Sequence, residues 1–104
     1  MYFSDYKQHP IMTVKPSLLW EYDLTNFDYQ AMRLVVVQRV IERGWPDDFY
    51  AIFNLYGEDG VYQATKEIAY LNPIDMNFVH VVFGIHLEEL KCYHNKDRPR
   101  HWKS

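Results

Sequence analysis

Cysteine, glycine and proline are scarce in this 104-residue chain, which contains one cysteine, four glycines and five prolines. The single cysteine, Cys92, cannot form an intramolecular disulfide and fits a reducing compartment better than an oxidising one. The low content of glycine and proline, with apolar residues spread along the chain, excludes a collagen-like or largely disordered protein.

Long apolar runs are also missing. Purely apolar stretches such as residues 34–37 and 81–83 are short, whereas a membrane-spanning helix needs about 20 predominantly apolar residues. The first residues lack the charged start and the continuous apolar core of a signal peptide. We therefore expect a cytoplasmic protein that does not cross a membrane.

Aromatic side chains, in contrast, are plentiful, with 9 Tyr, 6 Phe and 3 Trp. They supply enough apolar area for a chain of this length to bury a core without a disulfide or a metal ion. We expect one folded domain. The Trp and Tyr residues either fill that core or remain on the surface, where both types are favoured in binding hot spots.

Charge is unevenly distributed along the chain. Residues 1–90 contain 6 Lys and Arg against 13 Asp and Glu, whereas residues 91–104 contain 5 basic residues and one acidic residue. An acidic body is therefore followed by a basic tail. The tail is either a solvated terminus or a docking segment for an acidic partner or nucleic acid.

Hydrophobic periodicity and capping residues predict helices throughout the central part of the chain. Residues 1–16 show no helical period and form an irregular arm. Gly44 is expected to end the first helix in a left-handed conformation, and the segment 76–83 is apolar around so much of its circumference that we expect a central buried helix. The predicted helices span residues 28–43, 46–56, 58–70, 76–83 and 87–93.

These segments predict an all-α fold, a compact bundle of four main helices with additional short helices. The expected organisation is an irregular N-terminal arm over residues 1–16, a helical domain over residues 17–93 and a basic tail over residues 94–104. The run of three valines at residues 35–37 would also suit a buried strand. The helical spacing of the polar residues around it favours a helix.

No pattern of catalytic or metal-binding residues is evident. The histidines and Cys92 do not have the spacing of common zinc sites. The pairs Asp47-Asp48 and Glu88-Glu89 are explained by helix N-termini, whose dipoles favour carboxylates. The segment 57–60 lacks the Lys and Ser or Thr of a phosphate-binding loop. We therefore predict no enzymatic activity and no catalytic, cofactor-binding or metal-binding residue.

The segments 58–70 and 75–83 have the outline of a helix-turn-helix. The second segment offers only Asn77 and His80 as polar contacts to bases, and no Lys or Arg for phosphates. Core packing is the better interpretation of this pair. If nucleic acid is bound, the basic tail is the better candidate, because Trp102 can stack on a base between cationic side chains.

The order of several short motifs resembles a family of small uncharacterised bacterial proteins. The resemblance covers residues 16–102 and implies an all-helical fold. Genes of that family often lie beside nucleotidyltransferase-type toxins of the abortive-infection kind, which implies an antitoxin or accessory role. The motifs are residues 16–23 (PSLLWEYD), 40–44 (VIERG), 55–57 (LYG), 70–78 (YLNPIDMNF), 87–93 (LEELKCY) and 101–102 (HW).

The main functional hypothesis is a protein–protein interaction or antitoxin-like accessory module. Its partner is a protein, possibly a nucleotidyltransferase-type toxin, and a homodimer would occupy part of the same surface. The alternative is a nucleic-acid-binding regulator that uses the tail. The candidate partner-binding residues are Trp45, Arg98, Arg100, Trp102 and Lys103.

Overall fold

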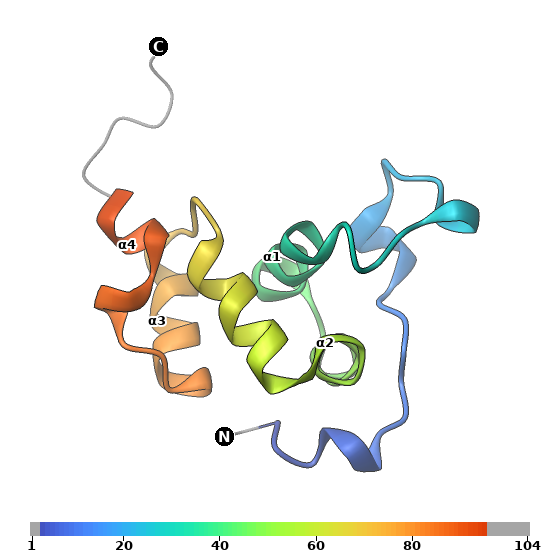
Figure 1. Cartoon of the computed structure of the whole chain (residues 1–104), viewed down its shortest axis with the longest axis horizontal. Coiled ribbons are helices and arrows are strands. Elements are labelled where there is room, and N and C mark those ends of the chain that lie inside the picture. The colour runs from blue at the N-terminus through green and yellow to red at the C-terminus, as the bar shows by residue number, and fades with distance from the viewer. Residues whose placement is uncertain (1–2, 96–104) are drawn as a thin grey trace.

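The computed structural model describes residues 3–95, and within them the chain is helical with no β-strand (Figure 1). The predicted all-α bundle of four main helices is confirmed. Four short 3-10 helices connect and precede the α-helices. The elements are η1 (Tyr6–Gln8), η2 (Pro16–Leu19), η3 (Leu24–Asn26), α1 (Arg33–Arg43), α2 (Pro46–Glu67), α3 (Pro73–Phe83), η4 (Leu87–Glu89) and α4 (Lys91–Asn95).

Helix α1 contains the valine run and buries one face of it. Val36, Val37 and Val40 are completely buried. The helix begins later than predicted, because the side chain of Asp28 accepts the N–H groups of Gln30 and Ala31 and holds the preceding residues in a turn. Asp28 thus caps a turn that leads into α1, and α1 itself has no side-chain cap.

Gly44 does not have the predicted left-handed conformation. Its φ of −75° and ψ of 158° are extended. The reason for glycine here is a close approach, because a Cβ atom would lie 2.6 Å from the carbonyl oxygen of Val40. The extended backbone continues through Trp45, which directly precedes Pro46. A residue before proline disfavours the helical region of φ and ψ.

Helix α2 contains both of the helices predicted over residues 46–56 and 58–70. Gly57, at φ 73° and ψ 170°, interrupts the helical backbone between its two halves. Only glycine adopts this conformation readily. The second half ends at Glu67, three residues earlier than predicted. The kink gives α2 two directions, so that both halves bury apolar residues in one core.

Helix α3 begins at Pro73 because the side chain of Asn72, and not that of Asp75, caps it. Asn72 Oδ1 accepts the N–H of Asp75 at 2.8 Å. Gly84, at φ 72°, ends the helix. Figure 1 shows α3 toward one end of the molecule, away from η2 and η3. The predicted central burial of residues 76–83 is wrong, since Val81 is 68% exposed. Ile74, in the first turn of the observed helix, is 80% exposed.

The last predicted helix, over residues 87–93, is divided into η4 and α4. Leu90 separates them with an extended backbone and has no exposed area. Asn95, at the end of α4, donates its side-chain N–H to the carbonyl of Ala69 at 3.1 Å. This contact fastens the end of α4 to the segment that follows α2.

The N-terminal residues 3–15 contain the short η1 helix, and they contribute to the core. Phe3 and Tyr6 are buried, and the ring of Phe3 stacks on Phe49 with 4.8 Å between centroids. The side-chain amide of Asn54 contacts the carbonyl oxygens of Tyr6, His9 and Ile11 at 2.7–3.3 Å. The arm is therefore fastened along the first half of α2.

A buried carboxylate joins the arm to the start of α2. Asp48 is 4% exposed. One of its oxygens accepts the N–H of Trp45 at 2.9 Å, and the other accepts the N–H of Lys15 at 2.8 Å. The prediction that Asp48 serves a helix N-terminus is confirmed, and the contact with Lys15 is an additional long-range link.

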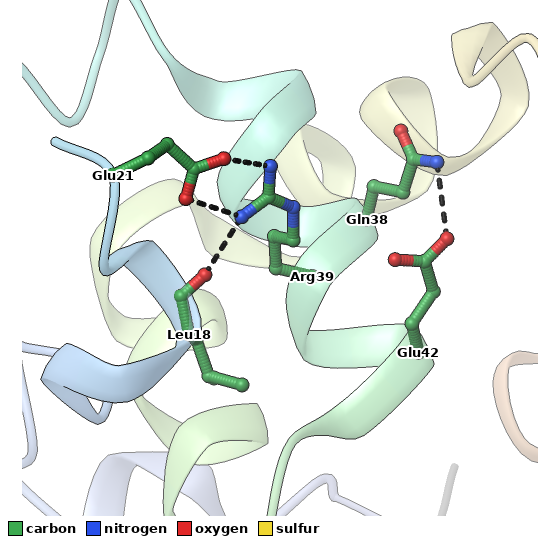
Figure 2. A network of polar contacts seen from close by, with 5 residues as sticks. All are labelled: Leu18, Glu21, Gln38, Arg39 and Glu42. Atoms are coloured by element: carbon green, nitrogen blue, oxygen red, sulfur yellow. Dashed lines mark hydrogen bonds and ion pairs between the residues drawn. The ribbon is translucent and has the colours of Figure 1, made fainter.

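A second polar contact fastens η2 to α1 (Figure 2). The guanidinium of Arg39 donates to both carboxylate oxygens of Glu21 and to the carbonyl of Leu18. This contact lowers the pKa of the Glu21 carboxyl to about 2. Figure 2 also shows Gln38 donating to Glu42 one turn later on α1.

Candidate functional site

The side chains with the most reactive groups have structural contacts. Cys92 is buried, and desolvation raises the pKa of its thiol. The Nδ1–H of His80 donates to the carbonyl of Ile85 at 2.8 Å, and the Nε2–H of His94 donates to the carbonyl of Glu88 at 2.7 Å. Within residues 3–95, no cluster of His, Cys, Asp or Glu has the arrangement of a metal site.

The carboxylates and tyrosines with altered pKa values also have structural explanations. Glu89 pairs with Lys66 at 3.0 Å, and this hydrogen bond lowers the pKa of its carboxyl. Desolvation raises the pKa of the Tyr56 hydroxyl, which donates to the carbonyl of Tyr29. These contacts show that Glu89 and Tyr56 help to hold the fold.

The most unusual surface feature is the outer face of α3, which we call the α3 ridge: Ile74, Asn77 and Val81. These residues follow an i, i+3, i+7 spacing and are exposed. Met76, Val79 and Phe83 face the core on the opposite side of the helix. Exposing an apolar face to water is unfavourable in free energy, and burial against another surface removes that penalty.

A large apolar groove lies along one side of the α3 ridge. Its volume is about 360 Å³, and three phenylalanine rings form much of it. The centroids of Phe49 and Phe78 are 5.3 Å apart, and Phe49 stacks on Phe3. We call it the phenylalanine groove, and it is lined by Phe3, Gly44, Pro46, Phe49, Phe78 and Val82.

A smaller groove lies along the other side of the ridge. It measures about 200 Å³ and is lined by Pro73, Met76, Asn77, Leu87 and Tyr93. Tyr93 belongs to α4, two residues before the end of the described chain. We call it the tyrosine groove. The ridge is therefore bordered on both sides by apolar depressions.

Trp45 is the predicted partner-binding residue that the structure describes. Its side chain is 65% exposed, and the ammonium of Lys15 lies 4.3 Å from the ring centroid. The neighbouring residues Gly44 and Pro46 line the phenylalanine groove. Trp45 is thus placed beside the groove, and its role in binding stays a prediction. The other candidates, Arg98, Arg100, Trp102 and Lys103, lie outside the described residues.

The helices that build the two grooves carry an acidic surplus. Residues 44–90 contain eight Asp and Glu residues and one basic residue, Lys66, whereas residues 1–43 contain five of each. Lys66 is already paired with Glu89. The surplus is evident at Asp75, where desolvation and the nearby carboxylate of Glu42 raise the pKa. A cation near this pair would relieve the repulsion.

Sequence reasoning missed Val81 because it treated residues 76–83 as a buried helix, and it missed Ile74 because it started that helix after it. A helical projection contained a usable signal. Residues 76, 79 and 83 form one apolar stripe, and residues 74, 78 and 81 form a second stripe on the other side. A short helix with two apolar stripes needs neighbours on both sides, and residues 3–95 leave Ile74 and Val81 of the second stripe exposed.

Comparison with known proteins gives one match. A protein family described as a family of unknown function (DUF6922) matches residues 14–65, from the end of the arm to the second half of α2. No curated protein and no solved structure matches the chain. Among residues 3–95, no helix has the length and apolar character to span a membrane.

Proposed function

The chain belongs to the DUF6922 family of unknown function, and from that premise we propose that it is a protein–protein interaction module. The observation that carries the proposal is the α3 ridge beside the phenylalanine groove. The ridge supplies exposed aliphatic side chains, and the groove supplies a concave aromatic surface. Together they form a docking surface for an apolar segment of a partner protein.

The energetics of association favour this use of the surface. Fully burying one aliphatic side chain contributes about 1.5–3 kcal/mol, and both Ile74 and Val81 are largely exposed. Helix-in-groove recognition relies on anchors at the i, i+3, i+4 and i+7 positions. The exposed aliphatic positions of α3 are seven residues apart, which suits a partner helix lying along the ridge.

The charge of the surrounding helices favours a basic partner. The surplus of carboxylates over residues 44–90 would attract a partner with Lys or Arg around its apolar anchors. The same surplus opposes a symmetric homodimer through α3, because two copies would bring like charges together. We therefore consider a basic partner protein a better occupant of this surface than a second copy of this chain.

The resemblance noted from the sequence motifs supplies a finer proposal. In this finer proposal, the partner is a nucleotidyltransferase-type toxin in a bacterial cytoplasm. This chain is then its antitoxin or an accessory protein. The alternative, a nucleic-acid-binding regulator, depends on the tail. The acidic surplus of the helical body would repel phosphates, which favours the protein partner.

The proposal is tested by site-specific photo-crosslinking in the cells that make this protein. A benzoylphenylalanine at position 81 should crosslink to one stoichiometric partner protein that survives nuclease treatment. The matched control places the same residue at position 63, where Gln63 is exposed on α2 and lines neither groove. Equal crosslinking at both positions, or adducts that nuclease removes, would contradict the proposal.

A further inference from the structure

The phenylalanine groove is built from three separate segments of the chain. Residues 44–49 supply the part at the start of α2, and Phe78 and Val82 supply the part from α3. The remaining wall is Phe3, which belongs to the N-terminal arm, of which the structure describes residues 3–15. The shape of the groove therefore depends on where the arm lies.

We propose that the arm completes the docking surface and that Asn54, on α2, is the residue that positions the arm. Phe3 forms the wall that an apolar side chain of the partner contacts, and Asn54 holds the segment that carries Phe3. Asn54 is not itself among the residues that line the groove. The contact with a partner rests on the proposed function, whereas the dependence of the groove on Asn54 is a property of this chain alone.

Phe3 lies against α2 through aromatic contacts. Its ring stacks on Phe49 with 4.8 Å between centroids and 5° between planes. It also meets Tyr50 edge-on, with 5.5 Å between centroids. Such aromatic pairs stabilise a structure beyond the area that they bury. Because Phe3 is only 4% exposed, it serves as a wall of the groove and not as a protruding anchor.

Asn54 holds the arm by its backbone. The side-chain amide of Asn54 donates to the carbonyl oxygens of Tyr6, His9 and Ile11, at 3.3, 2.7 and 3.1 Å. A carboxamide has two N–H groups, so the three acceptors share them. One side chain of α2 therefore fixes the path of the arm over residues 6–11.

The turn around η1 connects this backbone to Phe3. The N–H of Tyr6 donates to the carbonyl of Phe3 at 3.0 Å, and the N–H of His9 donates to the carbonyl of Tyr6 at 3.0 Å. The ring of His9 also stacks on Tyr50, with 4.0 Å between centroids. The backbone that Asn54 holds is thus tied to the residue that forms the wall.

A groove with this wall binds an apolar side chain better than an open surface does. Concave sites bury most of a bound group, and the apolar area removed from water favours binding. Without the arm, one face of the Phe49 ring would be open to water, and an anchor in the groove would lose its contact on that side. Arm docking and partner affinity are therefore coupled, and a bound partner should stabilise the docked arm by the same factor.

The test compares two substitutions on α2 of the full-length protein that each exchange a carboxamide for a carboxylate. Asn54→Asp removes both donors and places a negative charge against the carbonyl oxygens of the arm. The matched control, Gln63→Glu, makes the same change at an exposed position that lines neither groove.

Hydrogen exchange measures the release of the arm. Loss of two ordinary hydrogen bonds corresponds to a roughly thirtyfold rise in the ratio of released to docked arm. In Asn54→Asp, the amides of Tyr6 and His9 should exchange faster by up to this factor, and in Gln63→Glu they should exchange as in the wild type. Arm amides that stay equally protected in Asn54→Asp would overturn the role of Asn54.

Chemical shifts show whether the groove follows the arm. In Asn54→Asp, the signals of Phe78 and Val82 should move, while those of α4 stay in place and report an intact fold. Phe3→Ala removes the wall and should move the same two signals.

The combined Asn54→Asp and Phe3→Ala variant should move these signals no further than Phe3→Ala alone, because Asn54 acts on the groove through Phe3. A general loss of stability would not produce this pattern. A further shift in the combined variant would overturn the proposal. Unmoved groove signals together with fast exchange of the arm amides would also overturn it.

The crosslink from position 81 tests the consequence for the partner. Phe3→Ala should lower its yield several-fold, and Asn54→Asp should lower it in proportion to the released arm. Gln63→Glu should leave it unchanged. An unchanged yield in all three variants would overturn the contact between the arm and the partner. No crosslink even in the wild type would overturn the proposed function and that contact with it, while the spectra of purified protein would still decide whether Asn54 positions the groove.

Discussion

The segment before Gly44 and the segment after it differ in how they use charge and exposed apolar groups. The first segment has equal numbers of acidic and basic residues. Its polar side chains form ion pairs and hydrogen bonds that join elements of the fold, such as the Arg39–Glu21 pair. The second has a strong acidic surplus and presents the α3 ridge. Polar side chains hold the first segment to the core, whereas in the second segment Ile74 and Val81 of α3 are exposed.

The exposure of single apolar side chains does not distinguish the two segments. Trp20 is 75% exposed and Leu24 is 38% exposed, both in the first segment. Isolated apolar side chains on a surface are common and need no function. The α3 ridge differs because its side chains follow one helical face and border two grooves. We therefore compare the two segments by substitution, beginning with the contact that joins them.

Asp48→Ala should have the largest effect on stability, because Asp48 links the arm to α2. The substitution leaves the N–H groups of Lys15 and Trp45 without their buried acceptor. We expect the free energy of unfolding to fall by about 3 kcal/mol. Urea denaturation measures the change, and Asp47→Ala at the exposed neighbouring position is the control. Equal losses in both variants would show that the link to Lys15 contributes nothing.

Gly57→Ala should be destabilising through the backbone alone. A Cβ atom at this position would contact nothing within 4 Å, but the φ of 73° and ψ of 170° strain any residue other than glycine. We expect a loss of about 2 kcal/mol in unfolding free energy. Thermal unfolding checks it, with Gln63→Ala on the second half of α2 as the control. An unchanged melting temperature would mean that the kink in α2 can relax.

The pH dependence of stability should have opposite signs at Glu21 and Asp75. Arg39 holds the folded pKa of Glu21 at about 2. The contribution of ionised Glu21 to folding stability is therefore present above its unfolded pKa near 4.5. This contribution is lost as the pH falls toward 2. Desolvation and Glu42 raise the folded pKa of Asp75. Ionisation of Asp75 is therefore unfavourable for folding, and its contribution is lost as the pH rises through the folded pKa.

Two neutral variants separate these contributions. Glu21→Gln should be less stable than the wild type at neutral pH and should approach it near pH 2. Asp75→Asn should be more stable at neutral pH, and the gain should disappear in acid. Unfolding curves across this pH range provide the measurement. The same sign for both variants at neutral pH would refute the contrast between the two segments.

Val81→Asp and Leu24→Asp should have the smallest effects on folding. Both side chains are exposed, so the change in unfolding free energy should stay within about 0.5 kcal/mol. Their effects on binding should differ. Crosslinking from a benzoylphenylalanine at position 74 should be lost in Val81→Asp and kept in Leu24→Asp. If Leu24→Asp weakens it equally, η3 belongs to the docking surface as well.

The prediction from sequence was strongest for local structure. The valine run was correctly placed in a helix because polar residues with helical spacing surround it, and Gly57 and Gly84 were correctly placed at breaks. The errors were also local in kind. Asn72 and Asp75 are both good capping residues, and the structure uses Asn72. Pro73, directly after Asn72, is typical of the first position of a helix and was the sequence signal that favours Asn72 as the cap.

The candidate site was less predictable than the helices. Trp45 was expected to contact a partner, and it lies beside the phenylalanine groove. Val81 was expected in the core as part of the predicted buried helix over residues 76–83, since a strongly apolar helix is usually buried on all sides, and Ile74 lay outside that predicted helix. Their exposure depends on how many other elements surround α3. That number follows from the packing of the arm, α1, α2 and α4 and from no property of α3 itself.

The sequence by itself determined that this protein is α-helical, where most of its helices break, and that an acidic body precedes a basic tail. These properties follow from periodicity, from glycine and proline, and from the order of charges, all of which act over a few residues. The tertiary structure alone decided that Asp48 joins Lys15 across 33 residues and that one apolar face of α3 remains uncovered. Both depend on which distant segments meet, and loop closure and core packing determine those meetings jointly for the whole chain.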